Sequence, residues 1–105
     1  MIAPAENKAT VIKRILEAKQ KLASLGVAAI SLFGSFKRDE PSSSSDVDFL
    51  VEFEPDKHSF DNFMEVSFFL EELLGRSVEV VTPDSLSPYI GPYILREVEH
   101  VYITP

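Results

Sequence analysis

Two short apolar runs on either side of a polar segment constrain the fold of this chain most. Residues 27–33 form a short, mostly apolar run bounded by glycines, which is the pattern of a buried strand. Residues 46–53, rich in Val, Phe and Leu, indicate a second strand. The polar segment 34–45 contains Pro41 and four consecutive serines. We expect most of it to be loop, with a helical turn up to about Arg38.

Helical patterns flank this strand–loop–strand unit. Apolar residues recur at helical spacing from about Glu6 to Leu25, and Gly26 then favours a helix stop. Ser59 is a suitable N-cap for a second helix, which closes at Gly75. The face of this helix that we assign to the core consists of Phe60, Phe63, Met64, Ser67, Leu70 and Leu74.

The rest of the chain adds a third strand and a C-terminal extension. Residues 77–81 indicate a short strand, which Thr82-Pro83 ends. We then expect a helix over residues 93–99 and a short apolar end over residues 101–103. The order helix, strand, helical turn, strand, helix, strand and extension predicts an α+β fold, in which helices pack on a small mixed sheet.

Composition excludes several classes of protein. A chain of 105 residues is expected to form one domain over residues 1–105. The absence of cysteine excludes a disulfide scaffold, a Cys-ligated metal and a thiol nucleophile. The apolar runs are far shorter than the roughly 20 residues of a membrane span, and the N-terminus lacks a signal peptide. We therefore expect a cytoplasmic protein without a membrane partner.

The charge is unevenly distributed along the chain. The formal net charge is −7, with +5 in residues 1–38 and −12 in residues 39–105. Nucleic-acid binding depends on basic side chains that displace counterions, so we expect no direct nucleic-acid partner. The asymmetry favours a charged ligand or partner, although a solvated basic helix beside an acidic remainder would produce it too.

Two aspartates at the start of the second strand form a candidate metal site. Residues two apart project from the same face of a strand, so Asp46 and Asp48 present neighbouring carboxylates. Such a pair is tolerated when exposed, when one member is protonated or when a cation lies between them. Carboxylate oxygens suit Mg²⁺, which often shares its remaining positions with phosphates. Alone, Asp-x-Asp is a weak signal, because it also occurs as turn chemistry.

A Gly-Ser pair precedes the aspartates by a loop of suitable length. Gly34 lets a ligand approach the backbone closely, and the Ser35 hydroxyl with free N–H groups at a helix start would bind an anion. Ten residues separate Ser35 from Asp46, which is enough to bring the two sites together. An anion site beside a metal site predicts binding of a nucleoside triphosphate.

Glu79 is a candidate third carboxylate. It interrupts an apolar strand, where an unpaired buried charge would be costly. If this strand lies beside the strand of Asp46 and Asp48, the three carboxylates share one face and could hold two metal ions for nucleotidyl transfer. Alternatively, Glu79 lies on the exposed face of an edge strand and has no catalytic role. His58 and His100 are distant from the motif in sequence, and we assign them surface or packing roles.

At these residues the sequence resembles the minimal nucleotidyltransferase family of the DNA polymerase beta superfamily. The family signature is Gly-Ser, ten residues and Asp-x-Asp, which Gly34, Ser35, Asp46 and Asp48 match at that spacing. Arg38 falls where members commonly have an arginine, and we assign it to nucleotide binding. The C-terminal segment is similar to the tail of the same family, so the resemblance covers essentially the whole chain.

The resemblance implies an Mg²⁺-dependent transfer of AMP from ATP. Members are usually encoded beside a HEPN-domain ribonuclease toxin and act as its antitoxin by adenylylating a tyrosine in a complex with it. By the same resemblance, Gly34 and Ser35 would hold the β- and γ-phosphates, and Asp46 and Asp48 would ligate two Mg²⁺ ions. Glu79 would take the place of the third carboxylate, which is typically Asp in the family.

Two other functions remain open from the sequence. The chain could neutralise the toxin by binding alone, because a basic ribonuclease would be attracted to its acidic segment. It could also modify a small hydroxylated molecule such as an aminoglycoside, as related larger enzymes do, although we expect no second domain to form the pocket.

Overall fold

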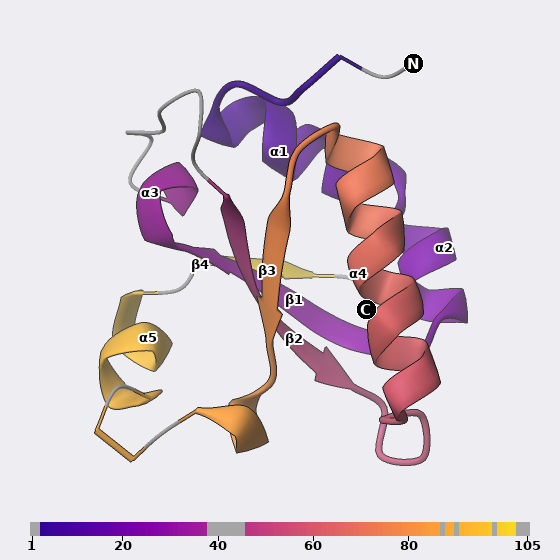
Figure 1. The fold of residues 1–105 in the computed structure, drawn as a ribbon, viewed down its shortest axis with the longest axis vertical. Coiled ribbons are helices and arrows are strands. Elements are labelled where there is room, and N and C mark those ends of the chain that lie inside the picture. Colours follow the sequence, from indigo (N-terminus) through magenta and orange to yellow (C-terminus); the bar gives the residue numbers. More distant parts are fainter. Residues whose placement is uncertain (1–2, 38–45, 87, 90, 98, 103–105) are drawn as a thin grey trace.

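The computed structural model describes residues 3–37, 46–86, 88–89, 91–97 and 99–102 (Figure 1). In chain order the elements are the helices α1 (Lys8–Glu17) and α2 (Lys19–Ser24), strand β1 (Val27–Phe33), helix α3 (Gly34–Lys37), strand β2 (Val47–Phe53), helix α4 (Phe60–Leu74), strand β3 (Val78–Val81), the 3₁₀ turn η1 (Pro83–Ser85), helix α5 (Gly91–Glu97) and strand β4 (Glu99–Tyr102). This order confirms the predicted α+β class and the three predicted strands.

The strands form one four-stranded mixed sheet in the order β3-β2-β1-β4. β1 pairs antiparallel with both β2 and β4, whereas β2 and β3 are parallel. The fourth strand corrects the expectation for the C-terminal segment, where the sequence indicated a helix over residues 93–99 and then only a short apolar end. Helix α5 ends at Glu97, and Glu99 belongs to β4. β4 is held by its pairing with β1, in which Ile30 lies opposite Val101. Four residues have little strand preference of their own, so this strand depends on the partner beside it.

A β-bulge in β1 changes which of its side chains face the core. The register with β2 shifts between Val27 and Ala29, so that Val27 pairs with Phe53 and Ile30 pairs with Val51. Residues three apart in a regular strand would point to opposite faces. The extra residue lets Val27 and Ile30 both enter the core, where both are buried.

Helices α1, α2 and α4 cover the core face of the sheet. Figure 1 shows α5 across the view from α2 and α4. The single helix expected from Glu6 to Leu25 is wrong, because the chain breaks at Ala18 into α1 and α2. The Ala18 N–H bonds the carbonyls of both Arg14 and Ile15, at 3.1 and 3.0 Å, which tightens the turn. No glycine or proline marks this break in the sequence. Among the described residues, no helix is long and apolar enough to cross a membrane.

Helix α4 begins and ends where the sequence predicts, but its buried face differs from the predicted one. The Ser59 side chain accepts a hydrogen bond from the Asn62 N–H, and Gly75 closes the helix with a φ of 64°. The buried residues are Val66, Leu70 and Leu74. The assignment of Phe60 to the core is wrong, since it is 77% exposed. At about 100° per residue, Phe60 is rotated about 80° from Leu70 and lies in the first turn of the helix.

Phe49 on β2 is among the largest fully buried side chains of the core. Replacing Phe49 by Ala should lower the free energy of unfolding by about 3–5 kcal/mol, because the substitution removes apolar contacts and leaves a cavity. Urea denaturation followed by circular dichroism measures the change. Phe68→Ala is the matched control, since Phe68 is 61% exposed and its truncation should change stability by less than about 1 kcal/mol. Equal losses in the two variants would contradict the observed core.

Candidate functional site

Asp48 belongs to β2, which lies between β1 and β3, and its side chain is on the face of the sheet opposite the core. Its register partners are Phe33 on β1 and Glu79 on β3. Directly paired residues project from the same face, so the Asp48 and Glu79 side chains lie next to each other. Val47 and Phe49 point the other way and are fully buried. The condition under which Glu79 would join the aspartates, that its strand lies beside the strand of Asp48, is met.

The backbone of Gly34 lies directly against the Asp48 carboxylate. It begins α3 with a φ of +77°, a conformation that residues with a Cβ rarely adopt. A Cβ atom built on Gly34 would overlap Asp48 Oδ2, and it would lie 3.0 Å from Asp48 Cγ. The backbone at Gly34 and the carboxylate of Asp48 are therefore in close contact. Although ten residues separate the two halves of the motif, the fold brings Gly34 and Asp48 together, and Ser35 follows directly in α3.

Phe36 anchors this short helix to the core, a role that the sequence reasoning missed. Its side chain is fully buried. The Arg76 guanidinium lies 5.0 Å from the centre of the Phe36 ring, and Arg76 Nη1 donates to the Ala5 carbonyl at 3.2 Å. A four-residue helix has little stability of its own. The Phe36 contacts therefore hold Gly34 and Ser35 in place. The available signal was the single aromatic residue next to Gly-Ser in an otherwise polar segment.

The three candidate carboxylates differ in position. Asp46 is exposed and precedes the first residue of β2, and Glu79 is exposed on β3, which is an edge strand. Asp48 is half-buried. Within the part of the chain that the structure describes, no three His, Cys, Asp or Glu side chains are arranged closely enough to hold a metal ion. The donors nevertheless suit Mg²⁺ in kind, since all three are carboxylates, and those of Asp48 and Glu79 lie on one face of adjacent strands. Arg38 lies outside the described residues.

His58 and Asp84 lie at the opposite end of β2 and β3 from this site. The His58 ring stacks on Phe53 with the ring centres 5.2 Å apart, in keeping with a packing role. A hydrogen bond from the Thr82 side chain lowers the pKa of Asp84, and the charge of His58 lowers this pKa further. The backbone of His100 lies in β4 opposite Ser31.

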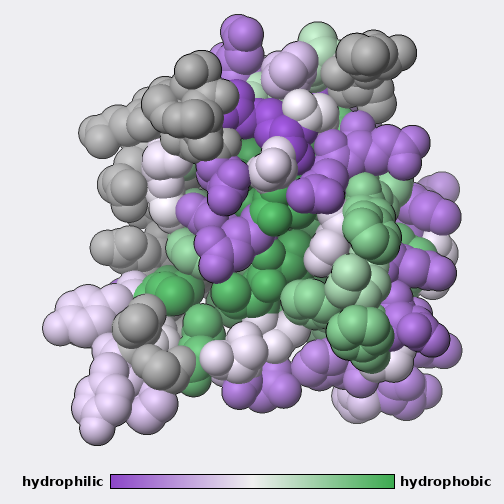
Figure 2. Space-filling model, in the orientation of Figure 1, coloured by the Kyte–Doolittle hydropathy of each residue, from purple (hydrophilic) through white to green (hydrophobic). Residues whose placement is uncertain are grey.

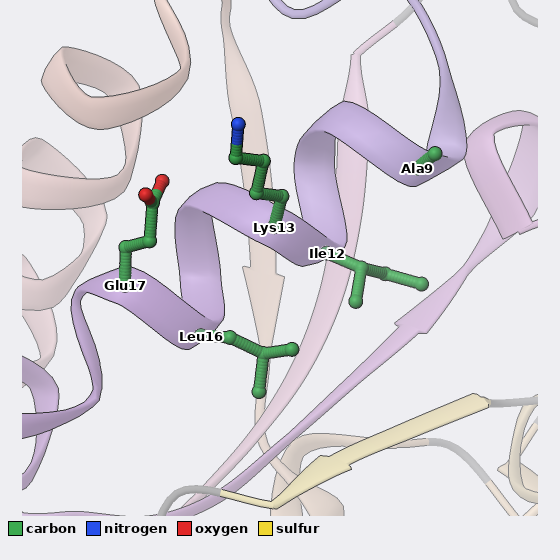
Figure 3. A pocket seen from close by; sticks show the side chains of 5 residues that line it. All are labelled: Ala9, Ile12, Lys13, Leu16 and Glu17. Carbon is green, nitrogen blue, oxygen red and sulfur yellow. The ribbon is translucent and has the colours of Figure 1, made fainter.

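An apolar hollow on α1 shares no residue with the Gly34–Asp48 site. It is lined by Ala9, Ile12 and Leu16, with Lys13 and Glu17 at its border, and has a volume of about 570 Å³. Figure 3 shows Ile12 and Leu16 pointing to one side of the helix and Lys13 and Glu17 to the other. None of the sequence-predicted functional residues lines this hollow.

A small mixed sheet with a Gly-Ser turn against a strand carboxylate is the arrangement of a nucleotidyltransferase. The chain matches the model of the nucleotidyltransferase domain family over residues 12–100, and it belongs to this family. Protein adenylyltransferase MntA of Thermococcus cleftensis is 42% identical over 92 residues, covering 86% of this chain and 92% of that protein. A Methanocaldococcus jannaschii relative, provisionally named a protein adenylyltransferase, is 36% identical over 88 residues, covering 83% of this chain and 80% of the relative.

Solved structures share the fold. One that is provisionally described as a minimal nucleotidyltransferase has a TM-score of 0.78 and 30% identity, covering 89% of this chain and 94% of that chain. A toxin–antitoxin structure with AMP-PNP has a TM-score of 0.70 and 20% identity, covering 89% of this chain and 73% of that chain. The structure of a tri-AMPylated Shewanella oneidensis HEPN toxin in complex with an MNT antitoxin has a TM-score of 0.65 and 18% identity, covering 92% of this chain and 73% of that chain. The predicted family and fold class are confirmed.

Proposed function

We propose that this chain transfers AMP from ATP to a hydroxyl of a HEPN-domain toxin and thereby acts as its antitoxin. The observation that carries the proposal is the contact between Gly34 and the Asp48 carboxylate, with Glu79 beside Asp48 on the next strand. Support comes from the 42% identity to protein adenylyltransferase MntA. Residues 1–105 would act as one domain.

Asp46, Asp48 and Glu79 are the residues that would hold Mg²⁺, as a pair of ions. When bound, the metal supplies charge stabilisation for the triphosphate and for the attacking oxygen. In the chain itself, Gly34 lets the β- and γ-phosphates approach the backbone, because no Cβ stands in their way. The Ser35 hydroxyl would donate to a phosphate oxygen, and Phe36 holds both residues in position. Arg38 would add a positive charge on the nucleotide.

The acceptor hydroxyl would come from a tyrosine of the partner protein. Its oxygen would lose its proton to solvent and attack the α-phosphorus of ATP. The bond from that phosphorus to the oxygen of the β-phosphate would break, and pyrophosphate would leave. A net charge of −7 opposes binding of a nucleic-acid acceptor, whereas it attracts a basic protein. The protein would therefore act in a complex with the toxin, in the compartment where both are made.

The direct test uses the purified chain, the HEPN protein encoded beside it, Mg²⁺ and ATP labelled on the α-phosphate. We expect the HEPN protein to become labelled. When EDTA removes the metal, no transfer should occur and the HEPN protein should stay unlabelled. ATP labelled on the γ-phosphate should leave the HEPN protein unlabelled, because pyrophosphate is the leaving group. Absence of α-label on the HEPN protein under these conditions would refute the proposed reaction.

Neutralisation by contact alone is the second candidate function. It is favoured by the exposed position of Glu79 on an edge strand, which suits a solvated charge as well as a metal ligand. Protection of cells by a variant that cannot transfer AMP would support it.

Modification of a small hydroxylated molecule is the third candidate. Label transfer to an aminoglycoside, in the absence of the HEPN protein, would support that reaction instead.

Glu79 itself can be tested by two substitutions. Glu79→Gln should lower the rate of AMP transfer about tenfold to a hundredfold, because it removes one charge next to Asp48. Glu79→Asp keeps the charge and should retain the rate within about tenfold. Steady-state kinetics with the HEPN protein measure both rates. An unchanged rate in Glu79→Gln would mean that Glu79 is only a solvated residue of the edge strand.

A further inference from the structure

One exposed face of α4 carries three carboxylates around a single aromatic side chain. Asp61, Glu65, Phe68 and Glu72 follow one another at intervals of four, three and four residues. At about 100° per residue these positions fall within about 60° of one another, so they form one stripe along the helix. We name these four residues the acidic–aromatic stripe.

The stripe points away from the core. Phe68 is 61% exposed, and all three carboxylate residues are exposed. Beside Phe68 lies a shallow hollow of about 360 Å³, which Leu25 and Phe69 line together with Lys21 of α2. Figure 2 shows apolar surface along α4 with hydrophilic surface beside it. An exposed aromatic side chain beside a hollow that is lined by both apolar and charged side chains is the arrangement of an interface anchor.

Charge identifies the occupant of this surface. α4 contains four acidic residues and no basic one, namely Asp61, Glu65, Glu71 and Glu72. Three of the four belong to the stripe, and two of these, Glu65 and Glu72, line the hollow beside Phe68 together with one basic side chain, Lys21. An amphipathic helix with an apolar residue flanked by Arg or Lys would fill the hollow and place its cations beside these carboxylates. An acidic or neutral helix would leave the carboxylates without complementary charge.

We propose that the acidic–aromatic stripe is the docking surface for a basic amphipathic helix of the protein that this chain modifies. The inference rests on the proposed function only for the identity of that protein, since docking itself requires no transfer of AMP. The stripe shares no residue with the Gly34–Asp48 site, so docking and catalysis can be separated by mutation.

The test measures the affinity for the HEPN protein by calorimetry without ATP. Phe68→Ala should weaken binding about tenfold or more, because the anchor is lost. The double variant Glu65→Lys, Glu72→Lys should weaken binding by a similar factor and reduce its dependence on salt. Leu16→Ala and Glu6→Lys are matched controls, an exposed apolar residue of α1 and an exposed acidic residue outside the stripe. Both controls should bind like the parent chain.

The outcomes separate docking from the proposed reaction. If the stripe variants lose affinity but the parent transfers no AMP, the docking surface stands and the proposed function fails. If the stripe variants bind like the parent, or the parent does not bind the HEPN protein, the docking proposal is overturned. Sedimentation of the chain alone tests one other occupant. A dimer that dissociates in Glu65→Lys, Glu72→Lys would identify a second copy as the occupant and overturn the proposal.

Discussion

Asp48→Asn should lower the rate of AMP transfer to the HEPN protein about a hundredfold to a thousandfold. The substitution keeps the shape of the side chain, but removes the negative charge that lies against Gly34 and beside Glu79. Transfer from ATP labelled on the α-phosphate measures the effect, and circular dichroism verifies that the variant is folded. Cells that express the toxin should no longer be protected by the variant, if protection depends on transfer.

Glu52→Gln is the matched control for this experiment. Glu52 lies on the same strand, is exposed and faces the same side as Asp48, but it is four residues further along, or roughly 13 Å. The Glu52→Gln variant should transfer AMP at the parent rate. Parent-like transfer by Asp48→Asn would exclude Asp48 from the catalytic site. Loss of transfer with full protection of cells would establish neutralisation by binding alone.

Gly34→Ala should lower AMP transfer about a hundredfold and also reduce stability by about 1–2 kcal/mol. The stability loss arises because Gly34 has a φ of +77°, which is costly for any residue with a Cβ. The loss of transfer arises because the added Cβ would overlap the Asp48 carboxylate and displace it. A displacement of about 1 Å at a catalytic group can cost a factor of a hundred. Thermal denaturation and label transfer measure the two effects.

Gly75→Ala separates backbone strain from damage to the site. Gly75 also has a positive φ, 64°, but it closes α4 and does not belong to the Gly34–Asp48 site. This control should lose a similar amount of stability and keep the parent rate of transfer at a temperature where both variants are folded. Equal loss of transfer in the two glycine variants would mean that the effect of Gly34→Ala is only destabilisation.

The strands and caps that the sequence predicted correctly depend on local patterns. The apolar runs of β1 and β2 are bounded by glycine or polar residues, and α4 lies between the N-cap Ser59 and Gly75. The predicted contact between the Gly-Ser pair and the aspartates also holds for Gly34 and Asp48. Local patterns did not predict the break between α1 and α2 at Ala18, where the hydrogen bonding changes without a glycine or proline. They also did not predict that Phe60 is exposed, because its apolar character favours the core.

By itself, the sequence determined the α+β class, the Gly-Ser and Asp-x-Asp motif and the membership in the nucleotidyltransferase family, because spacing and residue type are local properties. Only the tertiary structure decided that β4 pairs with β1, that Phe36 anchors α3 and that Glu79 lies beside Asp48. These arrangements depend on contacts between residues far apart in the chain, and such contacts form only when the whole sheet assembles. The same packing leaves Phe68 outside the core, among the carboxylates of α4.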